Sequence, residues 1–207
     1  MTQKLNVMSP IDGSKVGAIE LNSVSDLNNA VIKGEKAFQA WKETTLRQRS
    51  QILYKYRDLL IENIDSLSEL IYKENGKTLP EARAEIEKAI EITEFACSLP
   101  QSCTDKILEV SKGIHCKISK KPLGVVSSIV PLNFPSMVPH WTIPISIALG
   151  NAMILKPSEI VPLSAIEIAK YLKLAGLPDG VFQLIFGQKE IVEAICDHPQ
   201  IKALSFV

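Results

Sequence analysis

The chain has 207 residues, of which 46% are hydrophobic and 22% charged, the composition of an ordinary globular protein. Lys+Arg and Asp+Glu both number 23, so the formal net charge is zero. Nucleic acids and anionic membranes attract basic proteins, so this balance argues against both kinds of partner. The first ten residues, MTQKLNVMSP, include no apolar signal segment. We therefore expect a cytoplasmic protein.

The cysteines and the longest apolar stretch indicate neither a metal site nor a membrane span. The sequence has four cysteines and three histidines, with no Cys-x-x-Cys pair and no zinc spacing. We expect reduced thiols, three or more of them packed as small apolar side chains. The stretch 137–155 approaches the length of a membrane span, but its prolines and polar residues favour a buried helix followed by a buried strand. The cysteines are Cys97, Cys103, Cys116 and Cys196.

The first part of the sequence predicts two short strands and then a series of helices. Residues 5–21 predict strands on either side of a Pro-Ile-Asp-Gly turn. A helical pattern of apolar residues follows, with Ser25 as its N-cap. A longer pattern begins at Leu46, breaks near Asn63 and ends at Gly76, a typical stop signal.

The next helix begins with a predicted capping box at Thr78 and Glu81, with Pro80 in the first turn. Its apolar face points to the protein core. That face comprises Ile86, Ala89, Ile90, Thr93 and Cys97.

From Gly124 onward, apolar strands alternate with helices. Pro144 lies inside the first of these helices and should kink or split it. Buried strands with intervening helices indicate a parallel sheet covered on both faces. The fold class is therefore α/β, with a helical block before a partial doubly wound, Rossmann-like sheet. The predicted strands are 124–130, 152–155, 181–186 and 202–207, and the helices fall near 136–149, 162–175 and 188–197.

Two proline-stiffened loops, 131–135 and 156–159, follow the first two strands of this sheet. In an open parallel sheet, ligands bind beyond the carboxyl ends of the strands. Asn133 lies in the first loop, where the alternative to a ligand contact is a turn residue that caps the next helix. There is no G-x-G-x-x-G after Val130, so the usual dinucleotide fingerprint is absent.

The second loop carries a charged pair, Lys156 and Glu159. A carboxylate after the second strand can accept hydrogen bonds from both ribose hydroxyls of an adenine nucleotide, and the nearby lysine adds a donor. The negative charge disfavours a 2′-phosphate, which favours NAD over NADP. The alternative is a solvated ion pair near a helix start.

Three segments of the sequence resemble the aldehyde dehydrogenase superfamily. They are ENGKTLPEA, IVPLNFPSMVPHWTIPISIALGNAMILKPSE and GLPDGVFQLIFGQKEIVEAICDHPQIKALSFV. Within the superfamily they are most similar to the CoA-acylating methylmalonate-semialdehyde dehydrogenase branch. The resemblance spans nearly the whole chain, which matches only the N-terminal part of the family's length.

The resemblance implies that Asn133 is the oxyanion-hole asparagine. In the family, a cysteine thiolate attacks an aldehyde, and an amide N–H stabilises the alkoxide that forms. Hydride then passes to NAD, and coenzyme A opens the resulting thioester.

The resemblance also assigns residues to the cofactor and the substrate. Lys156 and Glu159 match the ligands of the adenosine ribose, while Val130 and Leu132 match positions that line the cofactor. Ile160 is a further cofactor-lining position, where this branch often has arginine.

Lys88 matches a position where the branch tends to place an arginine near the substrate carboxylate. Lysine keeps the charge but lacks the bidentate fork. The alternative for Lys88 is an exposed helix lysine.

Three parts of the chain follow from the same resemblance. Residues 1–112 correspond to the N-terminal strand and helix portion of the cofactor domain. Residues 113–123 correspond to an extended bridging or oligomerisation arm, and residues 124–207 to part of the NAD-binding domain. We expect a homo-oligomer or a complementary fragment as partner, because residues 202–207 would form an open strand edge.

The family's Gly-Ser pyrophosphate helix, general-base glutamate and nucleophilic cysteine have no match in these 207 residues. We therefore expect the N-terminal part of an NAD-dependent, CoA-acylating semialdehyde dehydrogenase that is inactive alone. One alternative is a catalytically dead, truncated product that serves only in binding or assembly. The other is the corresponding part of a hydrolytic aldehyde dehydrogenase.

Overall fold

A four-stranded parallel sheet lies at the centre of the protein, whose computed structural model describes residues 4–207. The first three positions of the N-terminal segment lie outside the described residues. The strands are β5 (Val125–Ile129), β6 (Ala152–Lys156), β7 (Phe182–Leu184) and β8 (Ile201–Phe206), in the order β7-β6-β5-β8. All residues of β5 and β6 are buried, including Ser127 and Ser128 of β5, as expected of parallel strands covered on both faces. The predicted α/β class is confirmed.

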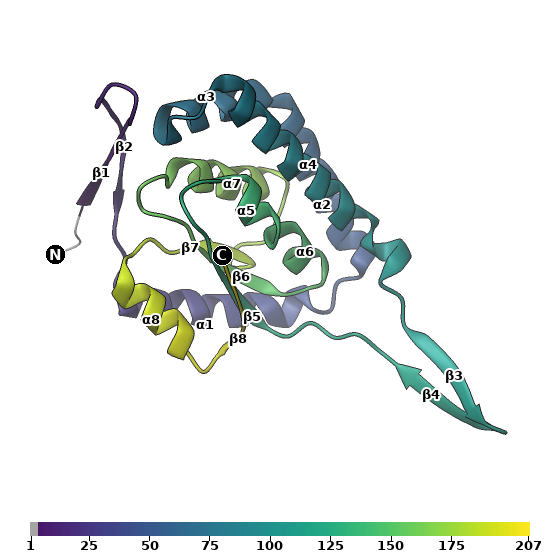
Figure 1. The fold of residues 1–207 in the computed structure, drawn as a ribbon. Helices are drawn as coiled ribbons and strands as arrows, with labels where there is room; N and C mark the ends of the chain where they lie inside the picture. The colour runs from purple at the N-terminus through teal and green to yellow at the C-terminus, as the bar shows by residue number, and fades with distance from the viewer. Residues whose placement is uncertain (1–3) are drawn as a thin grey trace.

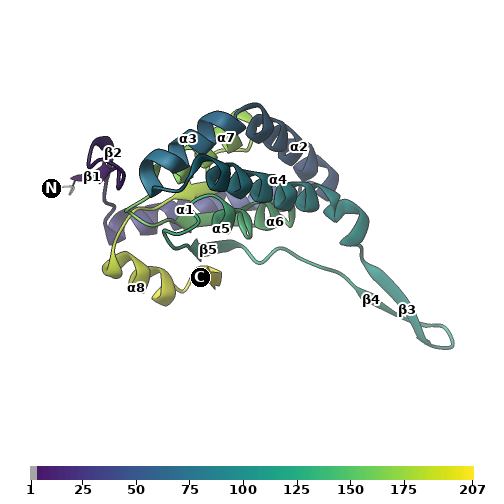
Figure 2. The same ribbon diagram turned by 45° about the horizontal axis from the view of Figure 1, so that its top comes forward.

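Helices connect the strands and cover both faces of the sheet. The connections contain α5 (Met137–His140) with α6 (Ile143–Ala148), then α7 (Leu163–Leu174) and α8 (Lys189–Asp197). Figures 1 and 2 show α1 (Val24–Trp41) and α8 on one side of the sheet and α5–α7 on the other. An outer layer packs on α5–α7. It consists of α2 (Leu46–Glu62), α3 (Ile64–Asn75) and α4 (Leu79–Ser102).

Two hydrophobic cores lie on opposite faces of the sheet. Val126, Met153 and Leu155 face the larger core, which joins the sheet to α2–α7. Val125 and Ile154 face the smaller core beneath α1 and α8. This alternation along each strand follows the two-residue period of β structure. Both cores therefore depend on β5 and β6.

Local capping boxes begin several of the helices. Thr78 and Glu81 form the predicted box at the start of α4. The cap of α1 is Ser23, which accepts a hydrogen bond from the Asp26 N–H at 3.2 Å. The expectation that Ser25 caps this helix was wrong, because the backbone leaves the extended conformation at Ser23 and Ser25 already lies in the first turn.

Pro144 interrupts the helical segment between β5 and β6, as predicted. The segment splits into α5 and α6, and Pro144 lies in the first turn of α6. Proline is tolerated at that position because an N–H in the first turn has no partner within the helix.

A two-stranded hairpin projects away from the body (Figures 1 and 2). It pairs β3 (Lys106–Ser111) with β4 (Ile114–Ile118), and every residue of both strands is exposed. The extended arm placed at residues 113–123 therefore contains only the second strand of the hairpin. A second hairpin joins the predicted N-terminal strands, β1 (Lys4–Met8) and β2 (Lys15–Glu20).

The cysteines are less buried than expected. Only Cys97 is buried, Cys103 is half-buried, and Cys116 and Cys196 are exposed. The expectation of three or more buried thiols was wrong because Cys116 lies on the projecting hairpin and Cys196 on the solvent side of α8. Burial raises the pKa of the Cys97 thiol to about 11.

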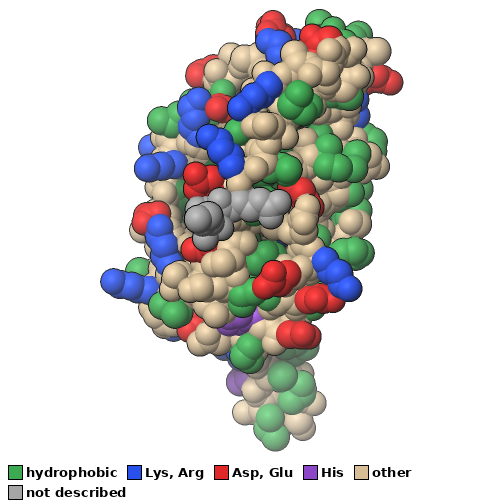
Figure 3. Space-filling model, turned by 90° about the vertical axis from the view of Figure 1, so that its left-hand side faces the viewer, with side chains coloured by type: hydrophobic (Ala, Val, Ile, Leu, Met, Phe, Trp, Pro, Cys, Tyr) green, Lys and Arg blue, Asp and Glu red, His purple; other side chains and the backbone are tan. Residues whose placement is uncertain are grey.

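The described residues carry charges of both signs and no long apolar helix. No helix within residues 4–207 is long and apolar enough to cross a membrane. Figure 3 shows basic and acidic side chains intermingled over one face of the molecule. That distribution agrees with the zero net charge.

A buried histidine links the outer helical layer to the segment after β5. The Tyr56 hydroxyl donates to His140 Nε2 at 2.7 Å, and His140 Nδ1–H donates to the Ser136 carbonyl at 2.6 Å. The two rings stack with centroids 5.8 Å apart. Burial lowers the pKa of His140 to about 4, so the neutral imidazole is the form that fits this site.

We expect His140 to make the fold sensitive to acid between pH 6.5 and 4. An unfolded histidine titrates near pH 6.5, whereas the folded pKa is about 4. The unfolded chain therefore binds a proton first as the pH falls. The resulting loss of unfolding free energy approaches about 3 kcal/mol below pH 4. Burial raises the pKa of Glu74. The folded chain therefore binds a proton at Glu74 before the unfolded chain does, so this group increases the free energy of unfolding as the pH falls.

Urea denaturation at several pH values tests the role of His140. The His140→Gln variant keeps a hydrogen-bonding side chain that does not titrate. Its free energy of unfolding should be lower at pH 7, and the difference from the wild type should shrink toward pH 4. Parallel pH curves for the two proteins would contradict the assignment.

Candidate active site

The loops that follow β5 and β6 lie together at one edge of the sheet. Ile129 is paired with Lys156 in the parallel register, and the Val130 N–H donates to the Lys156 carbonyl at 3.1 Å. This bond continues the pairing beyond β5, so both loops start at the same level. The structure thus brings Asn133 and Glu159 to one edge, as the sequence indicated.

Asn133 is exposed at this edge. It does not cap the following helix, because α5 begins at Met137 and its cap residue is Ser136. Within residues 4–207 the Asn133 carboxamide makes no hydrogen bond, and its N–H donors are available to a ligand. The turn-and-cap alternative is therefore not supported.

Lys156 and Glu159 form a largely buried ion pair. Lys156 Nζ lies 2.8 Å from Glu159 Oε2, and the side chains are only 8% and 20% exposed. This burial excludes the alternative of a solvated surface pair. The Lys156 ammonium is held by a carboxylate that still reaches the surface.

The neighbouring positions differ in what they can offer a ligand. The side chain of Val130 is buried in the larger core, so only its backbone is available. Leu132 and Ile160 are 45% and 58% exposed and provide apolar surface beside the two polar groups.

Lys88 lies on α4, away from both loops in the sequence. Its side chain is 59% exposed and pairs with Glu91 at 2.7 Å, a spacing of three residues on the helix surface. Its assignment to the substrate carboxylate stays a prediction.

The side chains that hold the Asn133 loop were not predicted from the sequence. Glu85 Oε1 accepts hydrogen bonds from the N–H groups of Ser136 at 2.7 Å and Met137 at 3.0 Å. Glu85 also forms an ion pair with Lys77. The available signal was its position, since Glu85 lies in the apolar stripe of α4 yet carries a charge.

Two further contacts complete this support. The Lys77 ammonium lies 3.8 Å from the centroid of the Phe134 ring, a cation–π contact. Asn75 Nδ2 donates to the Leu132 carbonyl at 2.8 Å. The loop is therefore fixed on both sides of Asn133.

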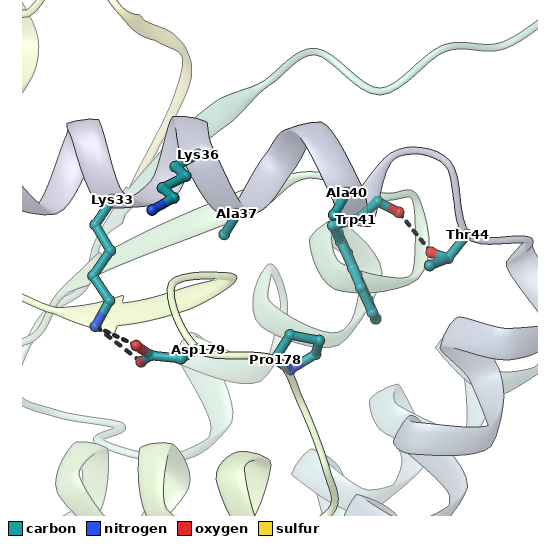
Figure 4. Close-up of a pocket in the computed structure, with 8 residues that line it drawn as sticks. All are labelled: Lys33, Lys36, Ala37, Ala40, Trp41, Thr44, Pro178 and Asp179. Carbon is teal, nitrogen blue, oxygen red and sulfur yellow. Dashed lines mark hydrogen bonds and ion pairs between the residues drawn. The ribbon is translucent and has the colours of Figure 1, made fainter.

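The pocket drawn in Figure 4 lies at the opposite edge of the sheet. It has a volume of about 460 Å³ and is formed by α1, Thr44 and the Pro178–Asp179 segment before β7. Its charged groups include Lys33, which pairs with Asp179 at 2.8 Å. Because it faces the amino ends of the strands, it is separate from the edge that carries Asn133 and Glu159.

No group of three or more His, Cys, Asp or Glu side chains within residues 4–207 is arranged to hold a metal ion. The polar groups at the carboxyl edge are an amide, an ammonium and a carboxylate, which suit an organic ligand.

The fold is that of the aldehyde dehydrogenase family. The chain belongs to that family, because the model of the aldehyde dehydrogenase family matches residues 1–207.

Among curated proteins, the chain is 39% identical over 203 residues to malonate-semialdehyde dehydrogenase 2 of Bacillus mycoides, covering 98% of this chain and 42% of that protein. Among solved structures, it is similar to methylmalonate-semialdehyde dehydrogenase from Oceanimonas doudoroffii, with 36% identity, a TM-score of 0.95 and coverage of 98% and 42%. A putative methylmalonate-semialdehyde dehydrogenase from Sinorhizobium meliloti, complexed with NAD, gives 36% identity, a TM-score of 0.95 and coverage of 99% and 42%. The chain thus spans about 42% of the length of these relatives.

We expect Glu159→Gln to destabilise the protein by about 2 kcal/mol, because it leaves the buried Lys156 ammonium without its counter-charge. The matched control is Glu167→Gln, which removes a pair of the same spacing with Lys170, whose side chain is 57% exposed. Exposed pairs contribute at most about 1 kcal/mol. Urea denaturation at pH 7 measures both losses, and equal small losses would show that the pair is a surface feature.

Proposed function

We propose that this chain forms the cofactor-binding and oxyanion-stabilising part of an NAD-dependent, CoA-acylating semialdehyde dehydrogenase of the malonate or methylmalonate type. The observation that carries the proposal is the placement of an exposed carboxamide, Asn133, at the same sheet edge as the Lys156–Glu159 pair. The names of the similar proteins support the substrate class, and the complexed Sinorhizobium meliloti structure supports NAD.

The residues at the edge fit the adenosine half of NAD. Glu159 uses one carboxylate oxygen for Lys156, which leaves the other to accept from ribose hydroxyls. The exposed side chains of Leu132 and Ile160 offer apolar contacts, and the backbone of Val130 is available at the same edge. When bound, NAD supplies the acceptor for a hydride. The charge of Glu159 disfavours a 2′-phosphate.

Asn133 donates from its side-chain N–H to the oxygen that becomes an alkoxide when a thiolate attacks an aldehyde. A donor aimed before the reaction lowers the barrier because the charge develops where the donor already lies. Lys88 is the candidate for the carboxylate of a semialdehyde. Coenzyme A is the proposed acyl acceptor by resemblance, and water is the alternative.

None of the four cysteines of this chain is placed as the nucleophile. Cys103 is the half-buried C-cap residue of α4. Burial raises the pKa of Cys97 to about 11, so its reactive thiolate is scarce at neutral pH. Cys116 lies on the projecting hairpin and Cys196 on α8, across the sheet from α5–α7. We propose that the nucleophile and the general base come from outside these 207 residues, and that the chain alone does not turn over. A role in binding or assembly alone is the alternative.

A joined protein tests this division of roles. Fusing the chain to the part of the Bacillus mycoides relative that it does not match should produce NADH from NAD, coenzyme A and malonate semialdehyde. Asn133→Ala should lower kcat by about 10²–10³ and leave the KM for NAD unchanged. Glu159→Gln should raise the KM for NAD about tenfold, the effect of one lost charged hydrogen bond, while Glu167→Gln changes neither.

Three outcomes would contradict the proposal. They are full kcat in the Asn133→Ala fusion, an unchanged KM for NAD in the Glu159→Gln fusion, and NADH produced by the unfused chain. Mass spectrometry of the product separates an acyl-CoA from a free acid, and so distinguishes coenzyme A from water as acceptor.

We also propose that the chain self-associates through the β3–β4 hairpin. Leu108 is paired with Cys116 and Lys106 with Ile118, so one face of the hairpin is largely apolar. Every residue of the hairpin is exposed, and an exposed apolar strand favours pairing with another chain.

Sedimentation velocity tests the role of the hairpin. We expect the wild-type chain to form dimers or larger species and Leu108→Lys to shift it toward monomer. The control is Glu109→Lys, which places the same charge on the opposite face. A wild-type monomer at high protein concentration would overturn the assignment.

A further inference from the structure

Two helices that follow the site loops are capped by buried glutamates from another part of the chain. Glu85 of α4 accepts hydrogen bonds from the N–H groups of Ser136 and Met137 at the start of α5, which lie 51 and 52 residues later in the sequence. Glu74 of α3 accepts from the N–H groups of Leu163 at 2.7 Å and Ser164 at 2.8 Å, across 89 and 90 positions. Both glutamates are almost completely buried.

Such distant caps are not the simplest solution for a helix start. In this chain α1, α2 and α4 each begin with a local capping box, which satisfies the same donors within four residues. The residues before α5 and α7, Ser136 and Pro162, make no side-chain cap. Burying two carboxylates instead carries a large desolvation cost. Unlike a local cap, a distant cap also fixes the position of each loop relative to the outer helices.

The two glutamates belong to one corner of the structure. They lie at the end of α3 and near the start of α4, on either side of the turn at Gly76. Gly76 has φ of 83°, and a Cβ there would lie 2.9 Å from Pro10 Cγ, so this turn requires glycine. Burial is the main cause that raises the pKa of Glu74, and the charge of Glu85 acts in the same direction.

We infer that this α3–α4 corner, defined as Glu74, Asn75, Lys77 and Glu85, positions the Asn133 loop and the Lys156–Glu159 loop relative to each other. Glu85, Lys77 and Asn75 hold the first loop. Glu74 holds the second loop through the start of α7. The inference rests on the proposed function of the two loops. These four are positioning residues, since an active-site donor displaced by about 1 Å loses much of its effect.

Backbone ¹⁵N relaxation of the 207-residue chain tests the inference without substrate or cofactor. The first variant, Lys77→Met with Glu85→Met, replaces the buried pair by apolar side chains of similar size, a change that often preserves stability. We expect the order parameter of the Asn133 amide to fall from about 0.85 to below about 0.6. The amides of Val125–Ile129 should remain rigid.

Further variants separate the two loops and cover the case in which the double variant does not fold. Asn75→Ala removes only the bond to the Leu132 carbonyl and should loosen Asn133 to a smaller extent. Glu74→Gln removes one of two acceptors at α7 and should lower the order parameters of Ser158 and Glu159 alone. The control is Arg83→Met, which breaks surface ion pairs of α4 with Asp65 and Glu87 and should leave both loops rigid.

The inference is overturned if the loops keep their wild-type order in these variants. It is also overturned if β5 loosens together with them, because that result would indicate general support of the fold. Neither result bears on turnover. The kcat of the Asn133→Ala fusion tests the proposed function separately, so the two failures are distinguishable.

Discussion

The parallel pairing of β5 with β6 is the constraint on which the site depends. Both strands are buried on both faces, and a shift of one residue would move every side chain into the wrong core. The pairing of Ile129 with Lys156 is therefore fixed. The two strands end level with each other, and an exposed amide and a buried ion pair lie at the same edge. The β5–β6 register therefore sets where the candidate site lies.

Much of the fold was predictable because its signals are local. The α4 capping box lies within four residues, and Pro144 acts on its own helix, so both features were visible in the sequence. The alternation of apolar strands and helices indicated the parallel sheet. Strand β3 was missed although it contains Ile107, Leu108 and Val110, because the extended arm was placed at residues 113–123 and all side chains of β3 are exposed. The same exposure explains the error about Cys116.

The sequence predicted where the candidate site lies, but not how deeply its ion pair is buried or which distant side chains hold its loops. The order of the elements placed Asn133 and Glu159 after neighbouring strands, and the resemblance gave them roles. Whether Lys156 and Glu159 form a solvated or a buried pair depends on how the rest of the fold covers them, which no short segment encodes. The contacts of Glu74 and Glu85 lie 51 to 90 positions away in sequence. A charged residue within an apolar stripe was the only local sign of them.

The order of these residues along the chain has a consequence for biosynthesis. Glu74 and Glu85 both precede the helix starts that they cap. Translation proceeds from the N-terminus, and N-terminal segments begin to fold first. The outer helices and their acceptor oxygens therefore leave the ribosome before the loops that they hold. Each loop emerges next to an anchor that has already been synthesised.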